Sequence, residues 1–282
     1  MAGLFDLEFH EKKIKEYQPT LAKLDLVIDW EMFRETIEKA LYVEPKGAGG
    51  GPPFDKIMMF KILILQKYYN LSDEQTEFQI NDRTSFKQFL GLKIGDTIPD
   101  EKTIWHFKEQ LANKDLSKSL FEMFAVALMD KGIIAKEGSI VDATFVDVPK
   151  QRNSKEDNAD IKKGAVPLKF GKKDKNGKQS KLCQKDTDAR WMTKSGEKHF
   201  GFKDHINADE KTKLITKYSV TSAAPHDSTE IENIVDETDD RLNADSAYRS
   251  KEIEEHLKAI ECESFVHEKG YRGSPLTEQQ KE

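Results

Sequence analysis

Two aspartates lie within segments that otherwise have the composition of buried strands. Asp142 is flanked by apolar and β-branched residues in Ile140-Val-Asp-Ala-Thr144, and Asp245 ends the segment Leu242-Asn-Ala-Asp245. A charged side chain in such a run costs free energy unless it is paired or binds a metal. Carboxylates suit Mg²⁺ or Mn²⁺, and two ions about 3.5–4 Å apart can activate a water and stabilise the leaving oxygen during attack on a phosphodiester. In the structural alternative, Asp142 caps a turn and Asp245 caps the next helix.

A strongly basic segment lies on an acidic chain. The net charge of the 282 residues is −6, but residues 150–203 contain 16 Lys and Arg against seven Asp and Glu, a balance of +9. The remaining residues therefore have a net charge of −15. This asymmetry predicts a place for a polyanion. A solvated, Lys-rich loop that binds nothing is the alternative.

Four side chains near this segment and after the second aspartate are candidates for DNA contacts. Arg190 is expected to contact phosphate, and Trp191 to stack on a flipped or single-stranded base, or else to cover the hairpin. Lys203 shares a strand face with His199 and His205, and from that face it would approach phosphate. The fourth candidate is Arg249, which follows the second aspartate. Its neighbour Tyr248 is explained equally well as a DNA contact or as a core ring.

The remaining pattern predicts an all-helical module followed by a mixed sheet. Apolar spacing indicates helices over 54–69, 73–81 and 84–90, and a long helix over 100–132 with a break near 113–115. The Gly- and Pro-rich residues 46–53 predict a linker. From residue 138 the order becomes strand, long insertion, strand, strand, helix, strand, helix and strand, with the last helices at 229–239 and 250–258. We therefore expect a helical module over 1–132 and an α/β domain over 133–282, with a loop-like or locally disordered insertion at 150–197.

Several classes of protein are excluded. The longest apolar cluster is interrupted by Lys61 and falls far short of 18 consecutive apolar residues, so we expect no transmembrane span. The first residues lack the pattern of a secretory signal. Cys183 and Cys262 form no metal-binding spacing, and two cysteines in a chain of this size suit a reducing, cytoplasmic location.

Four motifs, taken in order, resemble the DDE transposases of the insertion-sequence-five type. Gly138-Ser-Ile-Val-Asp-Ala-Thr144 is similar to the first-aspartate motif of that family, and Ala244-Asp-Ser-Ala-Tyr248 to its second-aspartate motif. Between them, Asp186-Thr-Asp-Ala-Arg-Trp191 and Lys198-His-Phe-Gly-Phe-Lys-Asp-His205 resemble the region that separates the two acids. The helical part, including Thr103-Ile-Trp-His-Phe107, resembles the family's N-terminal module.

The resemblance implies an RNase-H-like catalytic domain that binds Mg²⁺ (or Mn²⁺) through two Asp and one Glu and that cleaves and joins DNA at transposon ends. Asp142 matches the first acid and Asp245 the second, as catalytic residues and metal ligands. The family's Glu lies further on, in an Arg-rich stretch that the chain does not reach by Glu282, so we expect a C-terminally truncated transposase with impaired catalysis. Neither Glu268 nor Glu278 lies in the motif of the third acid.

The partners implied by this resemblance are double-stranded DNA and transposon inverted repeats, with a homodimer that brings two ends together. Two other functions remain open at this point. One is a different metal-dependent nuclease on the same fold, and the other is a non-catalytic DNA-binding remnant of a transposase.

Overall fold

The structure is a computed structural model that describes residues 6–17, 19–44, 52–135, 137–167, 170–173, 179–181, 185–194 and 196–268. The chain forms two compact units, Met1–Phe124 and Ala125–Glu282. Their boundary lies inside one helix, α8 (Leu116–Asp130), which begins in the first unit and ends in the second. The expected boundary at 132/133 falls just after this helix.

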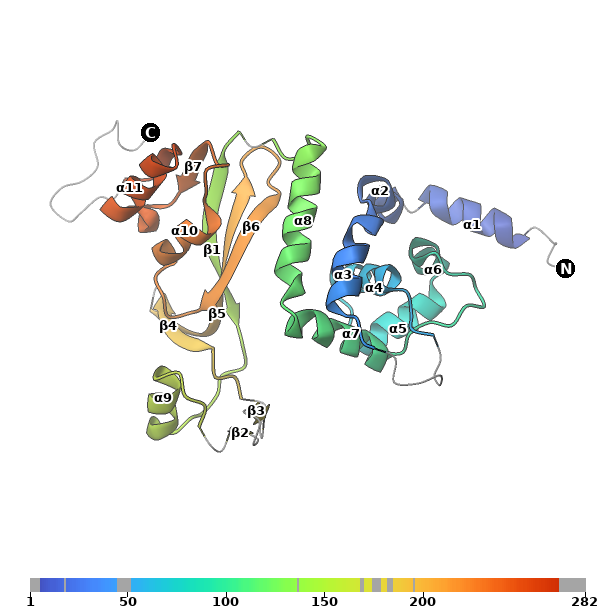
Figure 1. Cartoon of the computed structure of the whole chain (residues 1–282), viewed down its shortest axis with the longest axis horizontal. Coiled ribbons are helices and arrows are strands. Elements are labelled where there is room, and N and C mark those ends of the chain that lie inside the picture. Colours follow the sequence, from blue (N-terminus) through green and yellow to red (C-terminus); the bar gives the residue numbers. More distant parts are fainter. Residues whose placement is uncertain are drawn as a thin grey trace. The chain divides into compact units, whose positions relative to one another are not determined.

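The first unit is helical, as expected (Figure 1). The expected break in the long helix is confirmed, because Asp115 takes a positive φ of 51° between the last two helices. The linker predicted over 46–53 lies largely outside the described residues. The helical elements are α1 (Asp6–Tyr17), α2 (Pro19–Val27), η1 (Trp30–Phe33), α3 (Arg34–Ala40), α4 (Lys56–Tyr68), α5 (Asp73–Asp82), α6 (Thr84–Leu90), α7 (Glu101–Asn113) and the first part of α8.

Local signals in the sequence fix the ends of these helices. The Asp55 side chain accepts a hydrogen bond from the backbone N–H of Met58 at the start of α4. Ser72 and Gln75 form a reciprocal capping box at the start of α5. Gly91 ends α6 with a φ of +74°, a conformation that glycine adopts without steric cost. The apolar faces set between these caps then pack into one core.

The core of the helical unit is centred on α4. Ile62 and Leu65 of α4 are fully buried, and they share a cluster with Ile80 of α5, Phe86 of α6 and Ile104 of α7. This helix is apolar on most of its circumference because it is surrounded by neighbouring helices.

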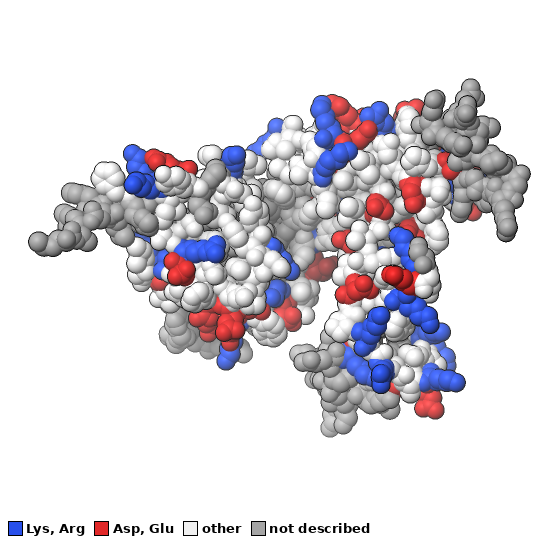
Figure 2. Space-filling view, turned by 180° about the vertical axis from the view of Figure 1, so that it is seen from behind, with Lys and Arg blue, Asp and Glu red and all other residues white. Residues whose placement is uncertain are grey.

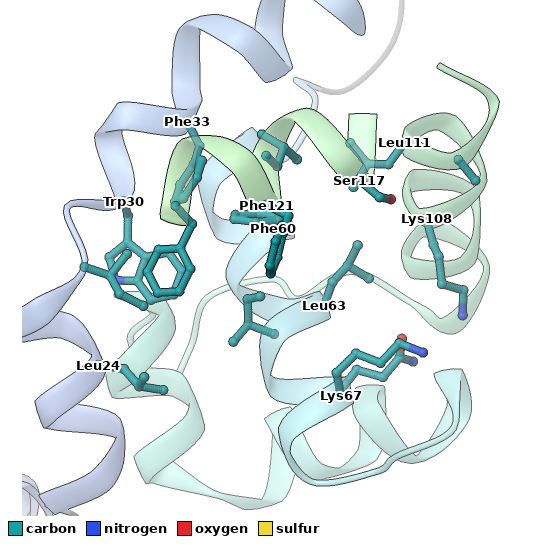
Figure 3. Close-up of a pocket in the computed structure, with 16 residues that line it drawn as sticks. Leu24, Trp30, Phe33, Phe60, Leu63, Lys67, Lys108, Leu111, Ser117 and Phe121 are labelled. Atoms are coloured by element: carbon teal, nitrogen blue, oxygen red, sulfur yellow. The ribbon is translucent and has the colours of Figure 1, made fainter. Parts of the chain in front are cut away.

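The same unit contains an apolar cavity of about 470 Å³ (Figure 3). Aromatic rings of Trp30, Phe60 and Phe121 form part of its wall, and Lys67 and Lys108 lie together on another side. No Asp or Glu is among the described residues that line the cavity, so it offers none of the carboxylate chemistry expected of the chain.

The second unit contains a six-stranded mixed sheet. Its strands are β1 (Ser139–Asp147), β4 (Arg190–Lys194), β5 (Glu197–Asp209), β6 (Ile215–Ser222), β7 (Arg241–Ala244) and β8 (Glu263–Val266). The order along the sheet is β4-β5-β1-β7-β8. β4 pairs with the first part of β5, and β6 pairs with the remainder of β5. β1 pairs with β5 in antiparallel fashion and with β7 in parallel fashion, and β7 pairs in parallel with β8. This is the expected RNase-H-like arrangement, preceded by the expected helical region.

Short helices connect the later strands and cover one face of this sheet. They are η2 (Asp227–Glu230) and α10 (Ile231–Ile234) before β7, and η3 (Ser246–Tyr248) and α11 (Lys251–Ala259) before β8. Their apolar side chains share a core with Val141 of β1 and Leu242 of β7. The helix expected over 229–239 is shorter than predicted, because Val235 is already extended, with φ −123° and ψ 131°.

The segment expected to be a loop or disordered insertion contains regular structure. It includes α9 (Lys155–Lys162), the hairpin of β2 (Gly171–Lys173) and β3 (Gln179–Lys181), and β4. The helix forms because Ser154 and Asp157 make a capping box and Ile161 is buried, features that the high charge of the segment obscured. Within this unit, α9 and the hairpin lie away from β7 and β8 (Figure 1). The rest of the expected insertion, residues 168–169, 174–178, 182–184 and 195, lies outside the described residues.

Gly201 marks the place where β5 changes neighbours from β4 to β6. A Cβ atom at this position would lie 2.0 Å from the backbone carbonyl oxygen of Val146 on β1. Glycine is therefore required here by the close approach of two backbones, and not by a positive φ.

Truncation of the α4 core is predicted to destabilise the helical unit. Ile62→Ala should lower its free energy of unfolding by about 2–5 kcal/mol, because a fully buried side chain leaves a cavity. Urea denaturation followed by circular dichroism measures this loss. Ile94→Ala, at a half-exposed isoleucine of the same unit, is the matched control and should change the value by less than about 0.5 kcal/mol. Equal effects of the two substitutions would contradict the assignment of the core.

Candidate active site

The structure brings Asp142 and Asp245 together at neighbouring positions of two parallel strands. The register pairs Val141 of β1 with Ala244 of β7; Asp142 follows Val141 within β1, and Asp245 directly follows Ala244, the last residue of β7. Asp245 keeps an extended backbone, with φ −74° and ψ 170°, so the strand geometry continues through it. Residues opposite each other in a parallel pair project from the same side of a sheet. The two aspartates therefore stand at the same level of the parallel pair.

Both carboxylates project from the side of the sheet opposite the covering helices. Val141 and Ala244 are buried in the core beneath those helices, whereas Asp142 and Asp245 are exposed. The period of two along a strand explains the contrast, since each aspartate directly follows a core residue. Solvent and a ligand have access to both acids on this side.

The aspartates also make local hydrogen bonds. Asp142 Oδ1 accepts a hydrogen bond of 2.7 Å from the backbone N–H of Ala143. Asp245 Oδ1 accepts one of 2.6 Å from Ala247 and thereby caps η3. The capping role that the sequence left open for Asp245 is thus present. This hydrogen bond occupies one carboxylate oxygen of Asp245 and orients the group, and the cap of η3 does not use the other oxygen.

The donor set fits part of a site for a hard divalent cation. Two carboxylates on adjacent strands supply the oxygen ligands that Mg²⁺ and Mn²⁺ prefer. In the described part of the chain, however, no group of three His, Cys, Asp or Glu side chains is close enough to hold a metal ion. Within that part of the chain, the pair therefore lacks a third ligand of these types.

A row of polar residues on β5 faces the covering helices, which differs from the sequence interpretation. Lys203 and His205 share a strand face, as expected, but both are buried, as is Asn207 on the same face. The alternation was misleading because the apolar residues of β5 occupy the opposite, half-buried face. His205 Nε2 lies 2.9 Å from Thr221 Oγ1, and burial lowers the pKa of its imidazole. Asn207 donates hydrogen bonds to the backbone of Ile234 and to a carboxylate.

Lys203 forms a buried ion pair with Asp227 instead of lying on the surface. Its Nζ is 2.7 Å from Asp227 Oδ1, and it also donates a hydrogen bond to the carbonyl oxygen of Pro225. The side chain of Lys203 is 4% exposed, so it has no open path to a phosphate. The prediction that Lys203 contacts phosphate is therefore wrong, because the ammonium is buried and its charge is already paired with the Asp227 carboxylate.

Asp227 is a residue that the sequence interpretation missed. It lies in η2, the short helix that connects β6 to α10, and this helix packs against η3, which follows Asp245. A signal was present in the chain: a lysine at an inward position of a strand requires an acid elsewhere in the fold. The sequence did not reveal which of the many acids supplies the partner.

The other candidates for DNA contacts differ in whether their side chains are already engaged within the protein. The guanidinium of Arg190 donates to the carbonyl oxygens of Thr187, Ala189 and Ile161 and so holds the insertion together. Trp191 is half-exposed, and one side of its ring packs on Phe200 at a centroid distance of 5.0 Å. The exposed part of this ring is accessible for stacking on a base.

Arg249 lies close to the second aspartate and bridges to β8. It donates to the carbonyl oxygen of Val266 at 2.8 Å and pairs with Glu268 at 3.3 Å. Tyr248, next to it, is 2% exposed and is a core ring.

Exposed basic side chains gather on the part of the second unit that contains α9 (Figure 2). The basic residues of this part of the chain that are exposed are Lys150, Arg152, Lys155, Lys162 and Lys163. We call this set the α9 basic surface. It belongs to the segment whose positive balance predicted a polyanion partner.

The strand order and the two adjacent acids define the class of this protein. A central strand with an antiparallel neighbour on one side and a parallel neighbour on the other, with an aspartate at the same level of the parallel pair, is the arrangement of an RNase-H-like domain. Residues 134–282 match the family model described as transposase DDE domain, and residues 8–110 match transposase domain (DUF772). The chain belongs to the DDE transposases, of the insertion-sequence-five type. No solved structure matches it.

Among the described residues, none of the helices has the length and apolar character needed to cross a membrane. Membership of a transposase family implies DNA as a partner and a requirement for a divalent metal.

Removal of the Lys203 charge is predicted to destabilise the second unit. Lys203→Met leaves the Asp227 carboxylate without its partner and should cost about 3–5 kcal/mol. The control is Lys211→Met, which breaks an exposed pair with Glu137 and should cost at most about 1 kcal/mol. Chemical denaturation measures both. A loss of stability for Lys203→Met no larger than that of the control would contradict the description of the pair as buried.

Proposed function

We propose that this transposase catalyses metal-dependent cleavage of phosphodiester bonds and strand transfer at transposon ends, with Asp142 and Asp245 as its catalytic, metal-binding carboxylates. The observation that carries the proposal is the register of β1 and β7, which sets the two acids side by side on the open side of the sheet. Mg²⁺ is the proposed cation, with Mn²⁺ as its substitute.

The two carboxylates would hold the cation between adjacent strands. When bound, the ion supplies Lewis-acid stabilisation of the phosphodiester and of the leaving oxygen. The protein contributes the direction of the carboxylates: Asp142 is fixed by the ladder of β1, and Asp245 by its hydrogen bond to η3. Fixed ligands need no reorganisation as the reaction proceeds, and this preorganisation favours catalysis.

The DNA is proposed to run from the acid pair towards the α9 basic surface. Lysines there would neutralise phosphates without reading sequence, which gives affinity and salt dependence. Trp191, half-exposed, would stack on a base near the cleaved strand, and Arg249 would contact the backbone beside Asp245. Arg190 is left to its role inside the insertion, because three carbonyl oxygens already engage its guanidinium.

A homodimer that pairs two inverted repeats is the proposed assembly, because a transposon has two ends. A second candidate function is end binding without catalysis. It is favoured by one observation: in the described residues, no third acid joins the pair. Retained binding of end DNA with no cleavage at any concentration of Mg²⁺ or Mn²⁺ would support this second candidate.

Neutralising either acid is predicted to abolish cleavage. Asp142→Asn and Asp245→Asn should each weaken Mn²⁺ binding and lower the rate of nicking by roughly 10–100-fold or more. Loss of an outer-shell partner of a metal ligand already costs this much, and these variants remove a proposed direct ligand. Calorimetric titration with Mn²⁺ and nicking of labelled inverted-repeat DNA measure the two effects.

The matched control for these variants is Asp147→Asn, which alters an exposed aspartate on the same strand. It should bind Mn²⁺ and cleave DNA as the unaltered chain does. Cleavage of arbitrary DNA as fast as inverted-repeat DNA would instead indicate a general nuclease, and unchanged nicking by Asp142→Asn would refute the proposed role of the pair.

The α9 basic surface is predicted to add affinity that is independent of sequence. The double variant Lys162→Gln/Lys163→Gln should bind all duplexes more weakly, and the slope of log affinity against log salt should become shallower by about 0.9 for each phosphate that the variant no longer neutralises. Fluorescence anisotropy at several salt concentrations measures this slope. Lys251→Gln/Lys258→Gln on α11, also exposed, is the control. Equal slopes for both double variants would exclude a DNA contact at α9.

A further inference from the structure

β8 brings a third polar residue to the level of the acid pair. It pairs in parallel with β7, and the register sets Val266 opposite Ala244. The residues that follow these two are His267 and Asp245. The pairing continues past the end of β8, because the backbone N–H of His267 donates to the carbonyl oxygen of Ala244 at 3.1 Å. Because the bonds of a parallel ladder are slanted, this one places His267 opposite Asp245.

The side chain of His267 lies on the open side of the sheet. Val266 and Ala244 are buried in the core beneath the covering helices, whereas His267 is exposed. Side chains alternate along a strand, so His267 projects from the side that carries Asp142 and Asp245. Two carboxylates and an imidazole therefore form a line across three adjacent parallel strands.

The spacing of this line separates the role of His267 from that of the acids. Neighbouring strands lie about 4.8 Å apart, so His267 stands one strand from Asp245 and two strands, about 10 Å, from Asp142. In the described part of the chain, no three side chains of the metal-binding types converge. An ion held between the two acids therefore leaves the imidazole to contact the molecule on which the ion acts.

The imidazole is available, and the backbone that carries it is fixed. The His267 side chain makes no hydrogen bond, ion pair or ring contact with another described residue. Arg249 donates to the carbonyl oxygen of Val266 at 2.8 Å and pairs with Glu268 at 3.3 Å, so it holds the residues on both sides of His267. An imidazole has an N–H donor in both its neutral and its protonated form. His267 is therefore equipped to donate to an anionic oxygen.

β8 lies on the other side of the acid pair from the insertion. The order along the sheet is β4-β5-β1-β7-β8, and α9 adjoins β4, where Arg190 donates to the carbonyl oxygen of Ile161. A DNA strand that passes the acids has phosphates on both sides of the reacting one. The α9 basic surface serves the side of β4, and His267 offers a donor on the side of β8.

We propose that His267 contacts the DNA backbone at the acid pair, where its imidazole donates a hydrogen bond to a phosphate oxygen beside the cleaved phosphodiester. It binds the substrate and is not a ligand of the cation. The contact holds the strand across Asp245 and so keeps the reacting phosphodiester at the acids. The inference rests on the proposed function, because it places the contact in the site where the DNA is cleaved.

Removal of the donor tests this contact. In the full chain with a chelator present, so that no cleavage occurs, His267→Ala should lower the affinity for labelled inverted-repeat duplex about tenfold, the order expected of one hydrogen bond to a charged group. Fluorescence anisotropy measures this affinity. His267→Phe keeps a ring without a donor and should show the same loss. His267→Gln keeps an N–H donor and should recover most of the affinity.

Two further measurements separate a DNA contact from a structural role and from a metal ligand. The midpoint of thermal unfolding of His267→Ala should equal that of the unaltered chain, because the side chain is exposed. Its affinity for Mn²⁺, measured by calorimetric titration, should also be unchanged. Glu263→Ala is the matched control, because Glu263 is exposed on the same strand, four residues before His267. It should not lower the affinity for DNA.

A set of duplexes, each with one phosphate replaced by an uncharged methylphosphonate, locates the contact. One of these replacements should weaken binding to the unaltered chain about tenfold, as the loss of the donor does. The same replacement should cost His267→Ala nothing further, because the bond is already absent from that variant. Additive losses at every position would contradict the contact.

The outcomes distinguish the contact from the proposed function. If the unaltered chain does not bind the duplex, the proposed DNA site and the contact fail together. If it binds and His267→Ala binds equally well, the contact alone is overturned. If His267→Ala loses affinity for Mn²⁺ and keeps its affinity for DNA, His267 is a cation ligand and the DNA contact is wrong. If His267→Ala binds DNA weakly while Asp142→Asn nicks as before, the contact stands and the role of the acid pair fails.

Discussion

The proposed catalytic site of this transposase depends on one parallel strand pairing. Three registered pairs between β1 and β7, from Ser139↔Leu242 to Val141↔Ala244, bring together two acids that are about a hundred residues apart in the chain. A slip of this register by one residue would send one carboxylate to the opposite face. The core beneath the pair prevents such a slip, because it would expose Val141 or Leu242, both of which are buried.

The two faces of the sheet carry different kinds of side chain. The covered face carries apolar side chains together with the polar row of β5, in which Lys203, His205 and Asn207 bind the segment between β6 and β7 and the end of β6 itself. The opposite face carries the acid pair, whose side chains are exposed to water. Buried polar contacts on one side thus provide rigidity, and the solvated carboxylates on the other side form the proposed reacting site.

Much of this arrangement could be predicted from the chain. Outside the insertion, the order of strands and helices followed from changes in apolar period, whereas β4 and the β2–β3 hairpin lie in the segment that was expected to be a loop. The acids were evident because carboxylates interrupted apolar strands. The polar row of β5 could not be placed, because a strand with polar residues at every second position gives no sign of which face is inward. Lys203 was therefore expected at the surface, and its partner Asp227, over twenty residues away in the chain, was missed. The helix α9 was missed because a capping box was outweighed by a high density of charge.

The glycine at position 201 has a bearing on how such a domain can diversify. At this point β1 leaves the sheet for the insertion, and its backbone lies so close to β5 that a methyl group would not fit. The root of the insertion is therefore anchored by contact between main chains, independently of the side chains further out. A change in the length or charge of the segment beyond that anchor would leave this contact between the backbones of β1 and β5 in place.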